Sequence, residues 1–293
     1  APDASAASRA SELVHGPMDW DRFFRAASLH GVLPLVYQNL KNATAAGVPS
    51  AVLSRFREVS LRNAGRNIRF AERLKRVCRL LEKKGIAVVP FKGPVLSQAV
   101  FGDAALRQFV DLDVLVPREA AWDAVKALRE EHYVPEISLS ASQFRSFARR
   151  NKSLAMVSLS GRVPLDLHWD LGGDYAHAAM SYDSFKAGLE TVELLGASFS
   201  TLGGADLVLF LCLNGAMDSW RRLDHLCCVA ELIRKDRDVL SRQIYEKAKR
   251  LHLKRCLLAG CGLVHSVLDV PIPDFLLDRI ERDGQVNAYV RAC

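Results

Sequence analysis

The chain has 293 residues, of which 49% are hydrophobic and 25% are charged, and its formal net charge is +7. The mean hydropathy is +0.04 and the longest strongly apolar run, Leu207 to Leu213, is too short to cross a bilayer, which excludes a helical membrane protein. The length suffices for one core or two modest domains, and the charge permits a polyanionic partner without requiring one.

The cysteines and the first residues give expectations about compartment and order. The seven cysteines show neither a CxxC motif nor the Cys/His spacing of a zinc site, so we expect reduced thiols in a cytoplasmic protein. No secretory segment opens the chain, which begins Ala-Pro-Asp-Ala-Ser without Met. Residues 1–10 are therefore expected to be a poorly ordered terminus, either processed or artificial.

The N-terminal part, residues 11–84, is predicted to be a helical lobe. Asp19 is a candidate N-cap, and Gly31-Val-Leu-Pro34 interrupts the helical pattern. A long helix is expected over 51–84, ending at Gly85, because glycine is favoured just beyond a helix C-terminus.

The middle of the chain, residues 85–203, alternates between strand and helix patterns. The expected elements are a strand over 86–91, a short helix over 96–101, a strand over 110–116, an amphipathic helix over 118–132, a strand over 133–137, and a hairpin of 154–159 with 163–169 that turns at Ser160-Gly161. From Asp206 onward the pattern is helical, with breaks near Asp236 and at Val270–Pro273, which defines a C-terminal helical lobe over 204–293. The predicted fold class is therefore α+β.

A pair of acids in the middle of the chain points to a metal-dependent reaction. Asp111 and Asp113 lie two residues apart in the apolar run that ends at Val116, and residues i and i+2 of a strand share one face. Two carboxylates on one face repel each other unless a cation lies between them. Magnesium is the usual cation for such oxygen ligands and often accompanies substrate phosphates.

The candidate for a third acid is Asp166. Asp166, His168 and Asp170 are expected on one face of their strand, opposite apolar residues. Asp166 could complete a two-metal site or deprotonate an acceptor hydroxyl. His168 could orient Asp166, contact phosphate or bind the acceptor. The alternatives are a solvated strand face for the acids and a structural, hydrogen-bonded histidine.

Three segments together resemble a known family. Lys92-Gly93-Pro94, the run from Leu106 to Val116, and Leu165-Asp166-Leu-His168-Trp169 look like the minimal nucleotidyltransferases of the DNA polymerase β superfamily. More closely they resemble a bacterial branch described as uncharacterised nucleotidyltransferases, over roughly residues 20–275. The resemblance implies that Gly93 belongs to the motif that cradles the triphosphate, that Asp111 and Asp113 bind both metals, and that Asp166 is the third acid.

The chain also departs from the superfamily pattern around the phosphate motif. Pro94 replaces a small residue and removes a backbone donor. Lys92 and Arg107 could compensate as phosphate ligands. The alternatives are a solvated loop lysine for Lys92 and an ion pair with a neighbouring acid for Arg107. The interval before Asp111 is long, so the loop 101–109 is expected to cover the site.

The resemblance is weakest in the C-terminal lobe. The family segment has basic or histidine residues where this chain has Asn214, Met217 and Asp218, and an acid where it has Cys228. These departures imply either different base or acceptor recognition or a lowered activity. Trp220 is expected to be a core residue, with base stacking as the alternative.

An arginine stripe marks the long N-terminal helix. Its members fall within about 80° of the helix circumference, without interleaved acids. They are Arg62, Arg66, Arg69, Arg73 and Arg76. The stripe is a candidate polyanion contact, such as RNA or the triphosphate, with a solvated face or inter-lobe salt bridges as the alternative.

The sequence thus predicts a nucleotidyltransferase that moves NMP from an NTP to an acceptor hydroxyl and releases pyrophosphate. Two Mg²⁺ ions are expected, with Mn²⁺ as a substitute, at Asp111, Asp113 and Asp166, while Lys92, Gly93, Arg107 and His168 bind the NTP. The acceptor (RNA, a small molecule or a peptide), the base and the oligomeric state are left open. The rivals are a tRNA-modifying toxin on the same fold and a non-catalytic nucleotide-binding protein.

Overall fold

The computed structural model describes residues 4–43, 47–159, 163–172 and 180–292. Its N-terminal helices are α1 (Ala4–His15), α2 (Trp20–Leu29), α3 (Leu33–Ala43) and α4 (Ser50–Lys83). The central strands are β1 (Val89–Pro90), β2 (Leu112–Leu115), β3 (Tyr133–Pro135), β4 (Ser153–Ser158), β5 (Leu165–His168), β6 (Leu189–Leu194) and β7 (Ala197–Leu202). The central helices are α5 (Gly93–Phe101), α6 (Ala121–Leu128), α7 (Ala141–Arg150) and α8 (Tyr182–Phe185). Short 3₁₀ turns flank α6, as η1 (Arg118–Ala120) and η2 (Arg129–Glu131), and follow α8, as η3 (Lys186–Gly188). The C-terminal helices are α9 (Gly204–Met217), α10 (Leu223–Lys235), η4 (Arg237–Leu240), α11 (Arg242–Arg250), α12 (Lys254–Leu268), α13 (Asp274–Arg282) and α14 (Gly284–Ala292).

The helix signals at the N-terminus are confirmed, with one correction. The side chain of Asp19 caps α2 by accepting a hydrogen bond from the Arg22 N–H at 2.9 Å, and Gly85 ends α4 with a φ of +72°. Residues 4–10, which were expected to be poorly ordered, belong to α1, because this alanine-rich stretch consists largely of good helix formers. Residues 1–3 lie outside the described ranges.

The central sheet has five strands in the order β1-β2-β5-β4-β3. Strands β2 and β5 are parallel and the other neighbours are antiparallel, so the predicted β4–β5 hairpin is confirmed. The expected turn at Ser160-Gly161 lies outside the described residues. The strand expected over 86–91 shortens to β1, because only Val89 and Pro90 pair with β2.

Helix α7, the short helix α8 and the β6–β7 hairpin were not predicted from the sequence, although α7 and the hairpin carry a local signal. Helix α7 begins with a capping box in which Ser140 and Gln143 satisfy each other's backbone N–H groups. The β6–β7 hairpin turns at Leu195 and Gly196, which both have positive φ, as a tight two-residue hairpin requires. This hairpin lies against the β1 edge, where the Thr201 hydroxyl donates to the Pro90 carbonyl at 2.7 Å.

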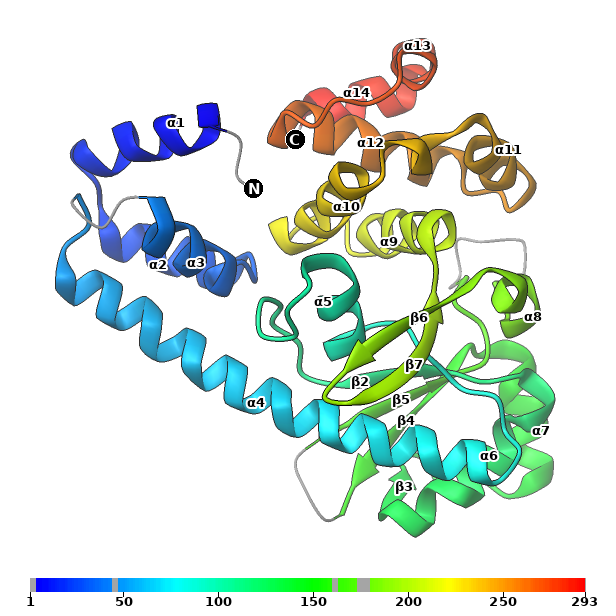
Figure 1. Ribbon diagram of the computed structural model, residues 1–293. Coiled ribbons are helices and arrows are strands. Elements are labelled where there is room, and N and C mark those ends of the chain that lie inside the picture. The colour runs from blue at the N-terminus through cyan, green and yellow to red at the C-terminus, as the bar shows by residue number, and fades with distance from the viewer. Residues whose placement is uncertain (1–3, 44–46, 160–162, 173–179, 293) are drawn as a thin grey trace.

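The two faces of the sheet have different partners. Leu112, Val114, Leu165 and Leu167 point to one face and pack with the apolar residues of α4 and α6. Because side chains alternate along a strand, Asp113, Asp166 and His168 point to the other face. That face lies toward α5 and the C-terminal helices (Figure 1), so the sheet presents its acids to the space between the lobes.

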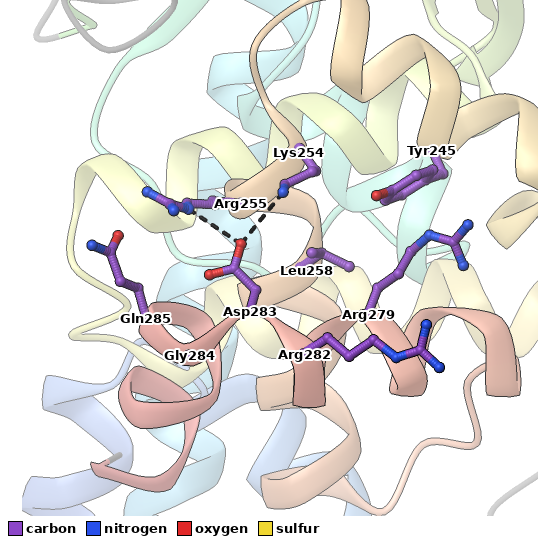
Figure 2. Close-up of a pocket in the computed structure, with 9 residues that line it drawn as sticks. All are labelled: Tyr245, Lys254, Arg255, Leu258, Arg279, Arg282, Asp283, Gly284 and Gln285. Carbon is purple, nitrogen blue, oxygen red and sulfur yellow. Dashed lines mark hydrogen bonds and ion pairs between the residues drawn. The ribbon is translucent and has the colours of Figure 1, made fainter.

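The helical lobes flank this sheet on different sides. Figure 1 shows the long helix α4 running from the N-terminal helices to the sheet, with α9–α14 above α5. The N-terminal helices form a small core around Phe56, and the C-terminal lobe forms a larger one that also takes in Phe91 and Leu115. Helices α11–α14 border a separate cavity of about 520 Å³ (Figure 2). Among the described helices, none combines the length and the apolar character needed to cross a bilayer.

Candidate active site

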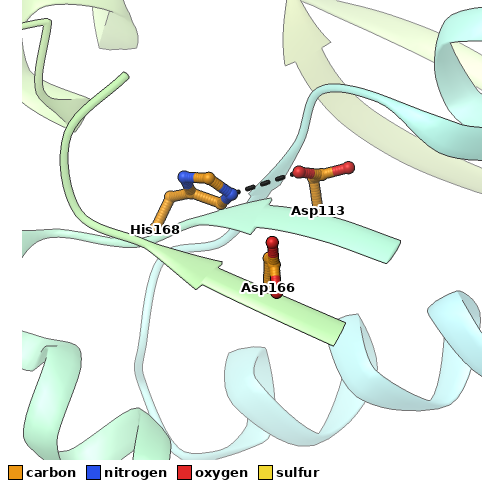
Figure 3. A group of neighbouring side chains, drawn as sticks. All are labelled: Asp113, Asp166 and His168. Carbon is orange, nitrogen blue, oxygen red and sulfur yellow. Dashed lines mark hydrogen bonds and ion pairs between the residues drawn. The ribbon is translucent and has the colours of Figure 1, made fainter. Parts of the chain in front are cut away.

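Two aspartates face each other across the parallel pair of strands. The register places Asp113 of β2 opposite Asp166 of β5, with Leu115 opposite His168. Figure 3 shows the side chains of Asp113, Asp166 and His168 on the same side of the two strands. One ligand atom from each of the three residues lies within 4.8 Å of the others, the spacing expected for groups that can share one ion. Asp111, just before β2, lies outside this group.

Asp113 is the buried centre of the site. Its side chain is 3% exposed, and its Oδ1 lies 3.1 Å from both the Lys92 Nζ and the His168 Nε2. Burial alone would raise the pKa of Asp113, but the Lys92 ammonium and the His168 hydrogen bond outweigh it and hold the pKa below its usual range. Asp113 is therefore an anion in the folded protein. His168 is held in place by Asp113 and by an edge-on contact with Phe91, with ring centroids 5.0 Å apart.

The pKa values of the other two acids, Asp111 and Asp166, are raised instead of lowered. Burial raises the pKa of Asp111, and the charges of Asp113 and Asp166 raise it further against the opposing effect of Lys92. Burial also raises the pKa of Asp166, with Asp113 adding to the effect and His168 opposing it. Three carboxylates thus meet with insufficient positive charge from the protein itself, and this donor set suits a divalent cation bound by oxygen ligands.

This imbalance predicts how stability responds to Asp111→Asn. Because the folded state raises the pKa of Asp111, the ionised side chain destabilises the fold at pH values above that pKa, and the penalty disappears as the pH falls through it. In metal-free buffer at pH 7, Asp111→Asn should therefore have a higher Tm than the parent protein, with the difference shrinking toward pH 4. Thermal denaturation across this pH range would measure it, and an equal or lower Tm at pH 7 would contradict the prediction.

The phosphate motif adjoins the acids at the start of α5. Gly93 has a φ of +59°, a conformation that favours glycine, and lies against the Asp111 carbonyl. Pro94 occupies the first turn of α5, where a backbone N–H would have no partner within the helix. Pro94 therefore costs α5 no hydrogen bond of its own, although it leaves one N–H fewer for a phosphate, and the positive end of the α5 dipole adjoins Asp111.

A cavity of about 990 Å³ opens beside Asp111 and Asp113 and is bordered by all three parts of the chain. The N-terminal helices and α4 contribute Ser28, Leu29, Gly31 and Arg66; the central part contributes Lys92, Gly93, Asp111, Asp113 and the loop residues Arg107 to Val110; the C-terminal lobe contributes Asn214, Met217, Asp218, Arg221, Arg222, Asp224 and His225. Asp166 and His168 lie next to Asp113 but do not line this cavity. The predicted loop over the site is therefore one of its walls.

Two buried asparagines hold that loop in position. The Nδ2 atoms of Asn63 and Asn67, one turn apart on α4, donate to the carbonyls of Ala104, Ala105 and Arg107 at 2.8–3.0 Å. Asparagine amides within an otherwise apolar helix face are a usable sequence signal, because a buried amide needs partners. They were missed because nothing in the sequence indicates which backbone they satisfy.

Arg107 lines the cavity, as a phosphate ligand would, and it also forms an ion pair with an acid, which the sequence offered as the alternative role. Its Nη2 lies 3.7 Å from Oδ2 of Asp224, and both side chains are at least 90% buried. Asp224 also accepts two hydrogen bonds of 3.0 Å from Arg222. Arg222 in turn packs on Gly31, where a Cβ would collide with its guanidinium. Asp224 therefore joins the loop, α10 and the N-terminal helices, a role that the sequence did not reveal.

The arginine stripe is not the uncompensated ridge that the sequence suggested. Arg62 is paired with Glu58, and Arg73 is paired at 2.9 Å with Glu131, which lies 58 positions along the chain. Arg69 and Arg76 are exposed. Only Arg66 turns to the cavity, and its Nε is buried without a hydrogen-bond partner in the described structure. The arginines do share one side of α4, but the packing of η2 on α4 gives Arg73 an acidic partner from outside the helix.

The positions at which the C-terminal lobe differs from the family pattern lie either in the cavity lining or in the core. Asn214, Met217 and Asp218 line the cavity. Cys228 is fully buried, and its thiol pairs with Arg107, although burial raises its pKa. Trp220 packs on Gly215 and Gly260, where a Cβ would overlap its ring, so it is a core residue as expected. The six cysteines in the described ranges are free thiols.

Comparisons with solved structures show likenesses at low identity. The solution structure of the antibiotic-resistance factor ANT(2'')-Ia aligns at 10% identity with a TM-score of 0.44, over 63% of this chain and 91% of that one. The crystal structure of ANT(2'')-Ia with adenylyl-2''-tobramycin aligns at 8% identity and TM-score 0.45, over 62% and 98%. The lincomycin-bound lincosamide adenylyltransferase LnuA aligns at 12% identity and TM-score 0.33, over 47% and 84%.

The family comparison covers most of the chain. No curated protein matches the sequence. Residues 16–269 match the family described as uncharacterised nucleotidyltransferase, a range that contains β1 to β7, the acids and the cavity. The fold is the α+β fold that the resemblance to the DNA polymerase β superfamily implied, with helices on both flanks. The chain is therefore a nucleotidyltransferase and belongs to this family.

Proposed function

We propose that this protein transfers NMP from an NTP to an acceptor hydroxyl, with release of pyrophosphate, at the face of the sheet that carries Asp113 and Asp166. The observation that carries the proposal is their direct opposition on parallel strands, beside Lys92 and the start of α5. A lysine ammonium beside a helix N-terminus is a setting in which phosphate groups are readily held.

The residues present fit a divalent ion. Asp113 and Asp166 would hold it, with Asp111, which lines the cavity, for a second ion and His168 as an orienting or nitrogen donor. We expect two Mg²⁺ ions, with Mn²⁺ as a substitute. When bound, such ions neutralise phosphate charge and clamp the attacking and leaving oxygens.

The chain's own side chains supply positioning and proton transfer. Asp166, which lies opposite Asp113, would accept the proton of the acceptor hydroxyl. Lys92, Gly93 and Arg107 line the cavity and would hold the triphosphate; Arg107 is oriented by Asp224. His168 fixes Asp113 by its 3.1 Å hydrogen bond. Orientation and fixed charges would supply most of the rate.

The decisive experiment uses each α-labelled NTP with Mg²⁺ or Mn²⁺ and a cell lysate fractionated into RNA, protein and small molecules. Label that reaches one fraction, and is absent with Asp111→Asn, would establish the transfer and identify both base and acceptor class. Metal-dependent NTP binding without label in any fraction would favour the non-catalytic alternative. Label in RNA would favour the tRNA-modifying alternative, which no longer draws support from an unpaired arginine ridge.

Arg66 provides a test of whether the cavity beside the acids binds the NTP. Because Arg66 lines the cavity, Arg66→Ala should raise the KM for NTP about tenfold, the effect of losing one charged hydrogen bond of about 1.5 kcal/mol. The matched control is Arg69→Ala, three residues away on the same helix and exposed. Equal KM values for the two variants in steady-state assays would remove Arg66 from the site.

A further inference from the structure

A second cavity lies in the C-terminal lobe, apart from the acids. Its volume is about 520 Å³, and Tyr245 of α11, Lys254, Arg255 and Leu258 of α12, and Arg279 and Arg282 of α13 line it with Asp283, Gly284 and Gln285 (Figure 2). The residues from Arg279 onward lie beyond position 269, where the family match ends. The family match therefore contains only part of this lining.

The charge of the lining is one-sided. Four cationic side chains meet a single carboxylate, Asp283, whose Oδ2 lies 3.4 Å from the Lys254 Nζ and 3.3 Å from the Arg255 Nε. Asp283 also accepts a hydrogen bond from the Val286 N–H, which further occupies its oxygens. Arg279 and Arg282, one turn apart on α13, therefore add positive charge that Asp283 does not balance, and like charges at this spacing destabilise a helix.

Arg279 is held in place by its neighbours. The Arg279 guanidinium lies over the rings of Tyr245 and Phe275, at 4.5 and 5.4 Å from their centroids, and its Nη1 donates to the Phe275 carbonyl at 2.7 Å. In Figure 2 the side chains of Arg279 and Arg282 extend in the same direction, away from Lys254 and Arg255. A planar guanidinium fixed in this way loses little entropy when it binds an oxyanion with its remaining donors.

The geometry points to a second anion site here, one that binds a ligand with two or more closely spaced phosphate groups. The guanidinium groups of Arg279 and Arg282, which extend together, match the several oxygens of such a ligand, with arginine donating in pairs. The ligand's phosphates come either from a free phosphorylated molecule or from a nucleic-acid backbone, and both present the same chemistry to the cavity. This site is independent of the acids at Asp113 and Asp166.

The test is a calorimetric titration with inorganic triphosphate in metal-free buffer at low ionic strength, where surface charges are least screened. Lys92→Ala removes a cation from the catalytic cavity and should keep binding in the C-terminal lobe. In that background, Arg279→Gln with Arg282→Gln should weaken the remaining binding about tenfold or more. The matched control is Arg291→Gln, an exposed arginine of α14 outside the lining.

Arg279 packs on two rings, so its substitution can also disturb the local fold. The single variant Arg282→Gln avoids this, because Arg282 is exposed, and it serves as the second test. Weaker triphosphate binding by this variant, with an unchanged Tm, is the expected result. Binding equal to that of the Arg291→Gln control would overturn the proposal, whatever happens at Lys92.

A short single-stranded RNA added to the Lys92→Ala protein distinguishes the two sources. Displacement of triphosphate by RNA from the Lys92→Ala protein, together with weaker direct binding of RNA when Arg282→Gln is added, would identify a nucleic-acid backbone. Failure of RNA to compete, with triphosphate still bound, would identify a free phosphorylated molecule, and either result keeps the site.

Discussion

Asp113→Asn is expected to lower kcat for nucleotide transfer by about a thousandfold or more, equivalent to about 4 kcal/mol of transition-state stabilisation. Asp113 is the one acid of the three whose pKa is held low, and it touches both Lys92 and His168. An amide at this position keeps the shape of the side chain but removes the negative charge that a divalent ion and Lys92 both require.

The fold should survive this substitution. Lys92 is 29% exposed, so its ammonium can turn to water when Asp113 loses its charge. The matched control is Asp123→Asn, an exposed acid of α6 paired with Lys126, which should keep full activity. Activity in the Asp113→Asn protein above about a tenth of the parent value, with an unchanged Tm, would show that the reaction does not depend on this carboxylate.

Asp224→Ala is expected to lower the free energy of unfolding by about 3–5 kcal/mol, because it leaves the buried Arg107 without the Asp224 carboxylate. Arg107 is 8% exposed and Asp224 3%, so water cannot replace the lost pair. Chemical denaturation should show a lower midpoint, and the KM for NTP should rise because Arg107 is no longer oriented.

The control for Asp224 is Asp183→Ala. Asp183 forms an ion pair with Lys186 in which both side chains are more than half exposed, and such solvated pairs contribute little to stability. If both variants lost similar stability, the assignment of Asp224 as a structural and positioning residue would be wrong. If Asp224→Ala were destabilised with an unchanged KM, its role would be structural alone.

Local sequence patterns were sufficient to predict the two strands that bear the candidate catalytic acids. The alternation around Asp113 and around Asp166 predicted two strands with an acidic face, and the structure has both. The helix signals at Asp19 and Gly85 act within a few residues and were equally reliable. These features depend on backbone geometry and on side-chain alternation, which a single segment specifies.

Contacts between distant segments could not be read in the same way. Arg107 and Asp224 are far apart in the chain, and Arg73 meets Glu131 only because η2 packs on α4. The periodicity of a helix shows which residues share a face but not what covers that face. The arginine stripe therefore looked uniform in the sequence, while in the structure its members have different environments.

Helix α4 also links the folding of two parts of the protein. Its first half contributes Phe56 to the N-terminal core, and its second half contributes residues from Phe70 to Leu81 to the core under the sheet. With 34 residues it is roughly 50 Å long and runs without a break between them. Loss of either core would leave half of a long helix without its packing, and isolated helices are only marginally stable in water. The N-terminal helices and the sheet should therefore unfold as one cooperative unit rather than in separate steps.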